Sequence, residues 1–555
     1  MTGRTGGQIL VDQLKIHGAS HVFCVPGESY LAVLDALHDA AITTIVCRQE
    51  GGAAYMAEAA GKMTGRPGIV MVTRGPGATN ASCGIHVASQ DSTPLIMFVG
   101  QVARDMKERE AFQELDYKAV FGTMAKWVVE IDRADRIPEI VSCAFHVASQ
   151  GRPGPVVIAL PEDMLTETAE VQDAPAFSPA VMKPGAADME ALQRRLLAAR
   201  RPIVLAGGSG WSEQGVTDLV RFAETFDLPV AVSFRRQMLF PADHPNFAGD
   251  LGIGPNPKLL QRIKDADLVL LAGGRLSEMP SQSYTLLDIP GDGSRLVHVH
   301  PGAEELNKVY RTGLGILAAP HAFAAAAAAL PKPNTVAWAG SAHAAHEDYL
   351  AWSDPSRVRT AGDLQMAGVM AHLRQVMPAA TVYCNGAGNY ATWVHRFWPF
   401  RSFASQLAPT SGTMGYGVPA AVAAKALQPE REVIAFAGDG CFLMNGQEFA
   451  TAMQYGLPII VVVVDNGMYG TIRMHQEREY PGRVSATSLR NPDFAALARS
   501  YGGHGETVTR TADFGPALAR ARQSGRASII HCLIDPEAIT PARSLTEIRN
   551  ASRAT

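Results

Sequence analysis

The sequence predicts an α/β protein made of three doubly wound domains, each built on a parallel β-sheet. Short apolar runs typical of fully buried strands alternate with helical stretches along the chain, as at residues 68–72, 268–272 and 459–464. At 555 residues the chain is too long for a single hydrophobic core. The alternation falls into three blocks, which favours one domain for each block.

Two polar stretches rich in Pro and Ala separate the blocks, at residues 166–187 and 331–356. We therefore expect an N-terminal domain over residues 1–168, a central Rossmann-like domain over 186–332 and a C-terminal domain over 356–540. The residues after the third domain are expected to form a polar tail.

The composition favours a soluble enzyme, and the cysteines favour a cytoplasmic location. A net charge of −4 gives no reason to expect nucleic acid or an anionic membrane as partner. The longest apolar run, at residues 457–464, is too short to cross a bilayer, and residues 1–10 lack the pattern of a secretory signal. Seven cysteines without a closely spaced pair favour reduced thiols over disulfides or a zinc site.

Two polar residues directly after predicted strands are the most informative feature. Asp439 stands between two glycines after the apolar run 433–436, and Asn466 follows the run 459–464. Parallel sheets bind ligands at the carboxyl ends of their strands, so both side chains should emerge at one edge. A carboxylate and an amide oxygen suit a magnesium ion that shares substrate phosphates. Glycines and a following helix N-terminus also favour a diphosphate at this place.

One helix fits between these two positions. Asn466 lies 27 positions after Asp439, which leaves room for the helix and return strand of a right-handed crossover. Asn445 is expected to cap this helix, with Glu448 as the acid of a capping box, and residues 456–458 (Gly-Leu-Pro) should end it.

The stretch from Asp439 to Asn466 resembles the thiamine-diphosphate binding motif. The resemblance implies that Asp439 and Asn466 bind Mg²⁺, with the carbonyl of Met468 as third protein ligand.

The central block departs from the flavin-binding pattern of relatives: Arg275 is present but the acidic pair is missing, and residues 207–210 lack the spacing of a dinucleotide fingerprint. This weakens the case for FAD.

The N-terminal block completes the resemblance. The stretches 48–54 (Arg-Gln-Glu-Gly-Gly-Ala-Ala), 75–80 (Gly-Pro-Gly-Ala-Thr-Asn) and 151–156 (Gly-Arg-Pro-Gly-Pro-Val) follow one another ahead of the diphosphate motif. In this order they resemble the acetolactate synthase branch of the thiamine-diphosphate enzymes. The resemblance names the three domains as pyrimidine-binding, central and diphosphate-binding.

By this resemblance Glu50 is the catalytic carboxylate, which drives imine formation on the cofactor's aminopyrimidine by general acid–base catalysis. In the family this glutamate reaches a cofactor bound mainly by another subunit, which implies a homodimer or homotetramer with active sites at the subunit interface.

Further cofactor contacts follow from the same resemblance. The carbonyl of Gly412 should accept a hydrogen bond from the aminopyrimidine, and Met414 should hold the two cofactor rings close together. The remaining implied contacts line the diphosphate and the metal: Gly386, Ala387, Gly388, Asn389, Tyr390, Gly438, Asp439, Gly440, Cys441, Asn466, Met468, Tyr469, Gly470 and Thr471.

The predicted substrate pocket departs from the family at two positions. Arg74 stands where acetolactate synthases usually have serine, and Glu28 where they have a small residue. Arg74 could clamp a substrate carboxylate and Glu28 could relay a proton, or the two could simply pair with each other or with neighbours. Phe112, Gln113 and Lys126 match pocket positions of the family, which keeps a 2-oxo acid plausible.

The favoured function is therefore decarboxylation of a pyruvate-like 2-oxo acid, followed by protonation of the product or ligation to a second carbonyl. Alternatives within the superfamily are a 2-hydroxyacyl-CoA lyase, a benzoylformate-type decarboxylase and a flavin-dependent oxidase. An intact Glu50 together with an intact metal motif argues against a non-enzymatic regulatory homologue.

Overall fold

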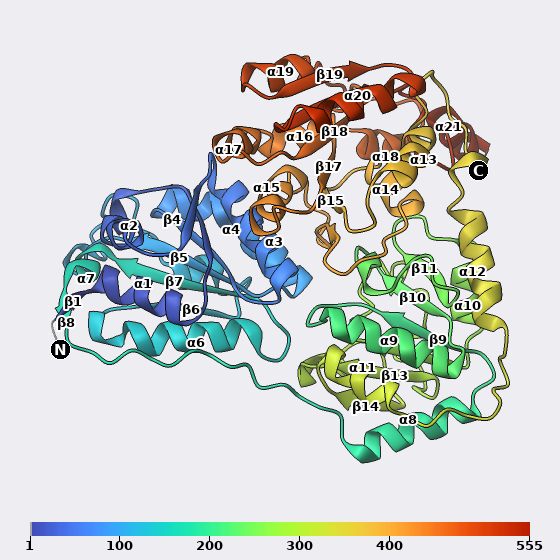
Figure 1. The fold of residues 1–555 in the computed structure, drawn as a ribbon, viewed down its shortest axis with the longest axis horizontal. Coiled ribbons are helices and arrows are strands. Elements are labelled where there is room, and N and C mark those ends of the chain that lie inside the picture. Colours follow the sequence, from blue (N-terminus) through green and yellow to red (C-terminus); the bar gives the residue numbers. More distant parts are fainter. Residues whose placement is uncertain (1–2, 555) are drawn as a thin grey trace. The chain divides into compact units, whose positions relative to one another are not determined.

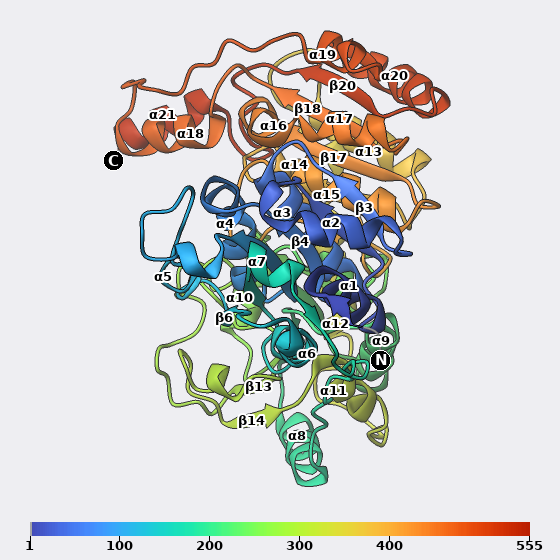
Figure 2. The same ribbon diagram turned by 90° about the vertical axis from the view of Figure 1, so that its left-hand side faces the viewer.

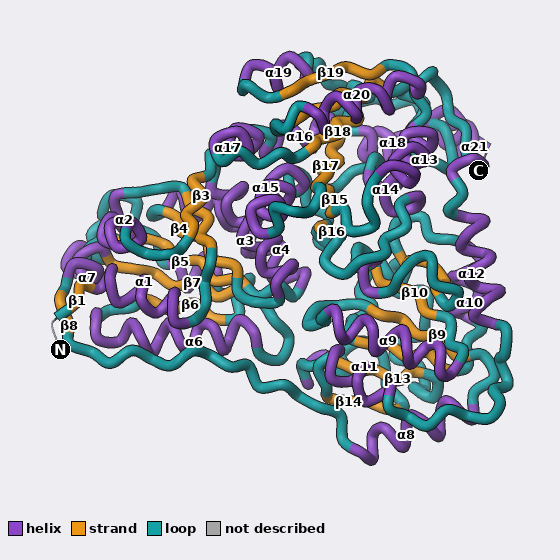
Figure 3. The backbone as a smooth tube through the Cα atoms, viewed as in Figure 1, coloured by secondary structure: helices purple, strands orange, loops and turns teal. Residues whose placement is uncertain are grey.

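A computed structural model describes residues 3–554, which contain three six-stranded sheets and one two-stranded ribbon. All pairings within the three large sheets are parallel. The predicted α/β class with three parallel sheets is confirmed (Figure 3). By compactness the chain forms two units: residues 1–180, 409–429 and 445–457 make the first, and the remaining residues make the second.

The first unit contains one large sheet and the α-helices that flank it (Figure 1). In spatial order its strands are β3 (Thr43–Val46), β2 (His21–Cys24), β4 (Gly68–Val72), β5 (Leu95–Gln101), β7 (Pro155–Pro161) and β6 (Trp127–Glu130). The ribbon pairs β1 (Arg4–Thr5) with β8 (Thr168–Ala169). The helices are α1 (Gly6–Ile16), α2 (Leu31–His38), α3 (Glu50–Thr64), α4 (Gly75–Asp91), α5 (Tyr117–Phe121), α6 (Ile137–Ser149), α7 (Glu162–Thr166), α15 (Gly417–Leu427) and α17 (Glu448–Gln454).

The strands of this sheet are buried on both faces. Alternate residues such as Ile96, Phe98 and Ile158 pack with α1 and α6 into one hydrophobic core. The strand residues between them, such as Met97, are also buried, on the face where α3 and α4 lie. Two-sided burial explains why these strands are continuous apolar runs in the sequence.

The second unit carries the other two sheets. The strands of the central sheet are β11 (Phe247–Leu251), β10 (Val230–Ser233), β9 (Pro202–Ala206), β12 (Leu268–Ala272), β13 (Leu296–His300) and β14 (Leu314–Leu317). Its helices are α8 (Ala186–Ala198), α9 (Glu213–Phe226), α10 (Pro257–Lys264), α11 (Pro320–Ala328) and α12 (Ser341–Trp352).

The C-terminal sheet has the order β16 (Gln406–Leu407), β15 (Val382–Asn385), β17 (Val433–Gly438), β18 (Ile460–Asp465), β20 (Ser528–Leu533) and β19 (His504–Val508). Its helices are α13 (Met366–Val376), α14 (Ala391–Phe397), α16 (Asp439–Asn445), α18 (Gly470–Glu479), α19 (Phe494–Ser500), α20 (Thr511–Gln523) and α21 (Leu545–Ala554). Short 3₁₀ helices over the whole chain are η1 (Glu28–Tyr30), η2 (Arg104–Met106), η3 (Ala134–Arg136), η4 (Gln237–Leu239), η5 (Ala303–Glu305) and η6 (Pro355–Arg357). Within residues 3–554, no helix has both the length and the apolar character needed to cross a membrane.

Three local expectations are wrong. The stretch 331–356, expected only to link two domains, contains α12, which lies against β11. The single helix expected between Asp439 and Asn466 is two helices, α16 and α17. The capping box at its start is also absent: Glu448 makes no capping bond to α17, and its carboxylate instead accepts hydrogen bonds from the backbone N–H groups of Arg48 and Gln49.

The C-terminal residues form a docked helix rather than the expected polar tail. Leu545 and Ile548 of α21 pack with Ile539 and Met474, and α21 lies beside α18 (Figure 2). Below this apolar contact, the fully buried carboxylate of Glu477 pairs with Arg549 of α21 at 2.6 Å and with Arg473 of α18. An apolar cluster and a buried ion pair together explain why a largely polar segment is ordered.

We predict that acid weakens the docking of α21. The hydrogen bond from Arg549, helped by Gly482 N–H and Arg473, lowers the pKa of Glu477 from 4.5 to about 2. A carboxyl with a lowered pKa in the folded state stabilises that state above pH 4.5, and this stabilisation is lost as the pH falls toward 2. The protection factors of the amides in residues 545–554, which compare each exchange rate with the intrinsic rate at the same pH, should therefore fall over this range. Glu477→Gln should exchange fast already at pH 7 and show a smaller pH effect; an unchanged pH response in this variant would contradict the assignment.

Candidate functional site

Glu50 is the first residue of α3, four residues after the carboxyl end of β3. Its half-buried carboxylate accepts a hydrogen bond of 3.0 Å from the side-chain amide of Asn80 on α4. The side chain of Gln49 caps the helix by accepting a hydrogen bond from Gly52 N–H at 3.1 Å. The predicted catalytic carboxylate thus stands at a capped helix N-terminus, oriented by one side-chain donor.

The segment that contains Gly412 and Met414 is tied to the side of α3 within the first unit. The hydroxyls of Thr413 and Tyr55 are 2.8 Å apart, and the hydroxyl of Tyr416 donates to Glu58 at 2.5 Å. Gly412 has a φ of +72°, a left-handed conformation in which glycine is favoured.

A buried ion cluster reinforces this attachment. Lys62 of α3 lies 3.1 Å from Glu58 and pairs closely with Asp91 of α4, and all three side chains are almost completely buried. Asp91 also accepts a hydrogen bond from the backbone N–H of Thr410 at 2.7 Å. Because buried charges are costly unless they are paired, this cluster restricts where residues 409–416 can lie.

The carboxylate of Asp439 lies at the carboxyl end of β17, as predicted, and is almost fully buried. Asn491, between β18 and α19, donates from one amide nitrogen to Asp439 at 2.7 Å and to Asp465 at 2.8 Å. Burial raises the pKa of Asp439 to about 6, and the neighbouring Asp465 carboxylate adds to this rise. Burial also acts to raise the pKa of Asp465, but hydrogen bonds from His531, Gly467 N–H and Asn491 outweigh it and lower that pKa.

These residues fit a cation. Two carboxylates share one neutral donor, and the amide oxygen of Asn491 is buried without a hydrogen-bond partner in the described part of the chain. Within residues 3–554 no three His, Cys, Asp or Glu side chains group as metal ligands. A magnesium ion at this place would therefore depend on amide and carbonyl oxygens, such as those predicted for Asn466 and Met468, and on phosphate oxygens.

The loop after β18 packs tightly against the turn after β17. A Cβ atom at Gly440 would come within 2.5 Å of the ring of Tyr469, and one at Gly470 within 2.9 Å of the side-chain nitrogen of Asn466. Met468 forms an isolated bridge with Ser488, and Tyr469 N–H donates to the carbonyl of Thr487 at 2.9 Å. Any larger residue at Gly440 or Gly470 would displace the side chains packed there, next to Asp439 and Asn466.

The loop at residues 386–390 follows β15, the neighbour of β17 in the sheet. The hydroxyl of Tyr390 accepts a hydrogen bond from Gly386 N–H at 3.0 Å and lies 3.1 Å from the sulfur of Cys441. The side chains of Asn389 and Thr471 are joined by a hydrogen bond of 3.0 Å. The structure therefore brings the predicted residues of three loops, after β15, β17 and β18, to one edge of the sheet.

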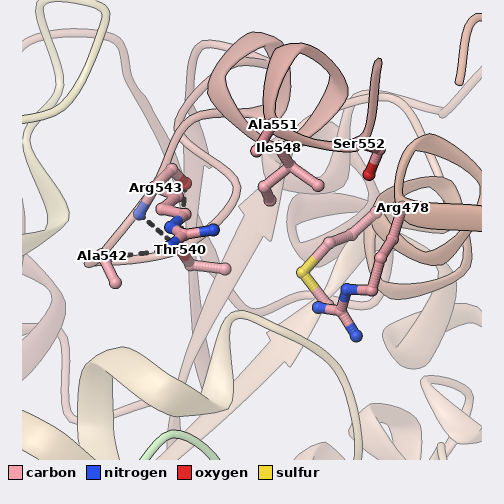
Figure 4. A pocket seen from close by; sticks show the side chains of 8 residues that line it. Arg478, Thr540, Ala542, Arg543, Ile548, Ala551 and Ser552 are labelled. Atoms are coloured by element: carbon pink, nitrogen blue, oxygen red, sulfur yellow. Dashed lines mark hydrogen bonds between the residues drawn. The ribbon is translucent and has the colours of Figure 1, made fainter. Parts of the chain in front are cut away.

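A surface cavity of about 450 Å³ lies between α18 and α21 (Figure 4). It is lined by Met474, Arg478, Thr540, Ala542, Arg543, Ile548, Ala551 and Ser552. Met474 also contacts the Asn389 amide through its sulfur at 3.5 Å. The cavity is thus one side chain away from the loop at residues 386–390.

Three of the other predicted pocket residues, Glu28, Phe112 and Gln113, lie close to Arg74 or to its neighbour Gly75. Its guanidinium pairs with Glu162 at 2.7 Å, lies 3.7 Å from Glu28 and donates to the carbonyl of Phe112 at 3.3 Å. The backbone of Gln113 is also close, because its carbonyl accepts from Gly75 N–H at 3.1 Å. The arginine side chain is buried, whereas the side chain of Phe112 is 71% exposed. This arrangement supports the pairing alternative for Arg74.

Lys126 has different neighbours. Its ammonium donates to the carbonyls of Val147 and Gln150 at 2.5 and 2.8 Å, at the C-terminal end of α6. A cation there satisfies carbonyls that have no partner within the helix and complements the helix dipole.

The sequence did not single out Asn80, Asp465 or Asn491 for a role, although each contacts a predicted site residue. Asp465 directly precedes Asn466, so its place at the end of β18 was available from the sequence. Asn491 lies 52 residues from Asp439, and no local pattern indicates their contact.

Three family models match the chain. The descriptions are "Thiamine pyrophosphate enzyme, N-terminal TPP binding domain" for residues 4–120, "central domain" of the same enzymes for 189–327, and "C-terminal TPP binding domain" for 386–532.

Relatives that match over most of both chains are named as acetolactate synthase subunits. The acetolactate synthase large subunit of Corynebacterium glutamicum is 30% identical over 96% of this chain and 87% of that protein. The Lactococcus lactis large subunit is 32% identical over 90% and 87%. The large subunit of acetolactate synthase isozyme 2 of Escherichia coli is 30% identical over 96% and 95%.

We predict that Asp439→Ala abolishes magnesium-dependent binding of thiamine diphosphate, because the metal loses its charged ligand and the diphosphate loses its bridge. Isothermal calorimetry measures this directly. Glu506→Gln is the matched control, since Glu506 is a carboxylate of the same sheet that pairs with Arg520. An unchanged cofactor affinity in Asp439→Ala would rule out this metal site.

We expect Arg74→Ala to lower thermal stability, since it removes the partner of Glu162 and a buried side chain; breaking such charge-assisted hydrogen bonds costs about 1.5–3 kcal/mol. Arg74→Lys should recover only part of the loss, because an ammonium cannot reproduce the planar contact. Thermal melts and Michaelis constants for 2-oxo acids are measured on the same preparations. A raised Michaelis constant with an unchanged melting temperature would instead assign Arg74 to substrate binding.

Proposed function

The chain belongs to the thiamine pyrophosphate enzymes, in their acetolactate synthase-like branch, and on this premise we propose a specific reaction for it. The proposed enzyme uses magnesium, decarboxylates a pyruvate-like 2-oxo acid, and then protonates the remaining fragment or ligates it to a second carbonyl. Relatives named acetolactate synthase at about 30% identity support a carboligase or decarboxylase.

The carboxylate of Glu50 carries the proposal. It is half-buried at the N-terminus of α3, and Asn80 binds one of its oxygens. A carboxyl group fixed in this way can hold or transfer a proton at a ring nitrogen placed against its other oxygen. In the absence of this group, the remaining residues of the site would support binding without proton transfer.

Thiamine diphosphate, when bound, supplies the carbanion chemistry that cleaves and forms bonds next to a carbonyl. Asp439, Asn466 and the Met468 carbonyl would hold the magnesium ion that anchors its diphosphate. Asn389 and Thr471, already hydrogen-bonded to each other, would line the same loop edge. Gly412 and Met414 would orient the aminopyrimidine, on a segment held in place by α3.

A homodimer or homotetramer with active sites at subunit interfaces is part of the proposal. Large apolar side chains beside the predicted diphosphate turn support it: Leu443 and Met444 on α16 are 49% and 47% exposed, and Ile472 on α18 is 56% exposed. Exposed apolar side chains gathered near a site are typical of surfaces covered by a partner.

FAD is not among the proposed cofactors, because the acidic pair expected near Arg275 is missing and residues 207–210 lack the spacing of a dinucleotide fingerprint. The turns after β9 and β12 lie against each other, since a Cβ atom at Gly208 would come within 1.8 Å of the carbonyl oxygen of Gly273. Arg236 closes the first turn by donating to the carbonyl of Gly208 at 2.9 Å. A cytoplasmic location also stays a prediction; none of the seven cysteines forms a disulfide within residues 3–554.

The test compares the wild type with Glu50→Gln. Both are given thiamine diphosphate, magnesium and a panel of pyruvate-like 2-oxo acids, benzoylformate and 2-hydroxyacyl-CoA thioesters, and the products are identified by NMR. We expect turnover of a 2-oxo acid by the wild type. In Glu50→Gln, cofactor affinity should be nearly normal, while exchange of the thiazolium proton into deuterium oxide slows by roughly a hundred- to ten-thousandfold.

The control for folding is the calorimetric cofactor affinity of both proteins. Exchange at the wild-type rate in Glu50→Gln would reject the role of this residue. Turnover restricted to the thioesters would replace the proposed reaction with that of a lyase.

A further inference from the structure

The carboxylate of Glu448 binds the backbone directly ahead of Glu50. One of its oxygens accepts hydrogen bonds from the N–H groups of Arg48 and Gln49, each at 3.0 Å. Its other oxygen accepts from the hydroxyl of Thr451 at 2.6 Å. The side chain of Glu448 is completely buried, and all of these donors belong to the same compact unit.

The start of α3 needs such an acceptor. N–H groups at a helix N-terminus have no partner within the helix, and an unpaired buried N–H is costly. The side chain of Gln49 caps Gly52 N–H, whereas the N–H groups of Arg48 and of Gln49 itself, directly ahead of the helix, are bound by Glu448 from elsewhere in the chain. A carboxylate at this end of a helix is also favoured by the helix dipole.

The contact leaves little freedom. A Cβ atom at Gly52 would come within 2.6 Å of the Glu448 carboxylate, so the side chain is packed directly against the first turn of α3. Arg48 N–H is also within 3.3 Å of the second carboxylate oxygen. Glu448 therefore sets both the position of the chain before α3 and its distance from α17.

We propose that Glu448 is a positioning residue for Glu50: it fixes the backbone at Arg48 and Gln49, while Asn80 orients the carboxylate itself. The inference depends on the proposed acid–base function of Glu50. Two supports fix the reacting group from opposite ends, one at the main chain and one at the side chain. Misplacement of a catalytic group by about 1 Å can reduce a rate about a hundredfold.

The first experiment needs no cofactor. Amide hydrogen exchange in the cofactor-free protein should show protection at Arg48 and Gln49, lost in Glu448→Ala and in Glu448→Asp, whose shorter side chain cannot reach both N–H groups. Glu448→Gln should keep most of it, because its amide oxygen can accept the same two hydrogen bonds. Absence of protection in the wild type would overturn the inference.

The second experiment measures exchange of the thiazolium proton in the same variants with thiamine diphosphate and magnesium. We expect Glu448→Ala and Glu448→Asp to slow it about a hundredfold with little change in cofactor affinity, and Glu448→Gln to recover most of the rate. Gln454→Ala is the matched control: it removes a contact from α17 to the Arg48 side chain and leaves the backbone contacts intact. It should exchange at the wild-type rate.

A double variant separates the two hypotheses. If Glu448 acts through Glu50, Glu448→Ala combined with Glu50→Gln exchanges no more slowly than Glu50→Gln alone. Wild-type exchange in Glu50→Gln would reject both the proposed function and this inference. Slow exchange in Glu50→Gln, together with a wild-type rate in any folded Glu448 variant whose Arg48 and Gln49 amides have lost protection, would overturn the inference alone. Multiplying effects in the double variant would overturn it as well. Should Glu448→Ala not fold, Glu448→Asp carries the same comparison.

Discussion

Parallel sheets impose the constraint on which this site depends. Their central strands are buried on both faces and are mainly apolar, so the polar side chains of the predicted site stand in the turns that follow the strands. In a parallel sheet all of these turns lie at one edge. Asp439 directly follows β17, Asn466 directly follows β18, and Gly386 follows β15. In the first unit, Glu50 and Arg74 likewise stand just after the carboxyl ends of β3 and β4.

Buried charges show which carboxylates have charged partners within one chain. Lys62 lies between Glu58 and Asp91, and Glu477 is paired with two arginines, so these carboxylates have cationic partners. Asp439 differs. Its donor is the neutral amide of Asn491, which it shares with Asp465, and burial shifts its pKa upward. A carboxylate buried in this way is poorly compensated, and a bound cation would supply the missing charge.

Helix α3 joins the predicted catalytic carboxylate to the segment at residues 410–416. Its first residue is the predicted catalytic carboxylate, and later residues on it hold residues 410–416 through Tyr55, Glu58 and Lys62. Its N-terminus is held in turn by Glu448 of α17. Because the same helix carries the predicted catalytic carboxylate and holds the segment proposed to bind the aminopyrimidine, a displacement at either end would affect both.

The sequence by itself determined the sheet class, the three parallel sheets and the positions of Asp439 and Asn466 after strands. These follow from apolar runs and glycine-flanked turns, which are local patterns and survive without knowledge of the packing. The sequence also offered an ion pair between Arg74 and Glu28 as an alternative to substrate binding. It did not indicate that Glu162 is the nearer partner of Arg74.

The tertiary structure decided what long-range contacts control. Glu448 matches a local capping box, yet its carboxylate binds the N–H groups of Arg48 and Gln49 directly ahead of α3, and Arg48 is 400 residues away in the chain. Asn491 joins Asp439 and Asp465 only through folding of the chain. The polar C-terminal segment becomes α21 because Glu477 and a small apolar cluster bind it. Such contacts join residues far apart in the chain, so local patterns cannot predict them.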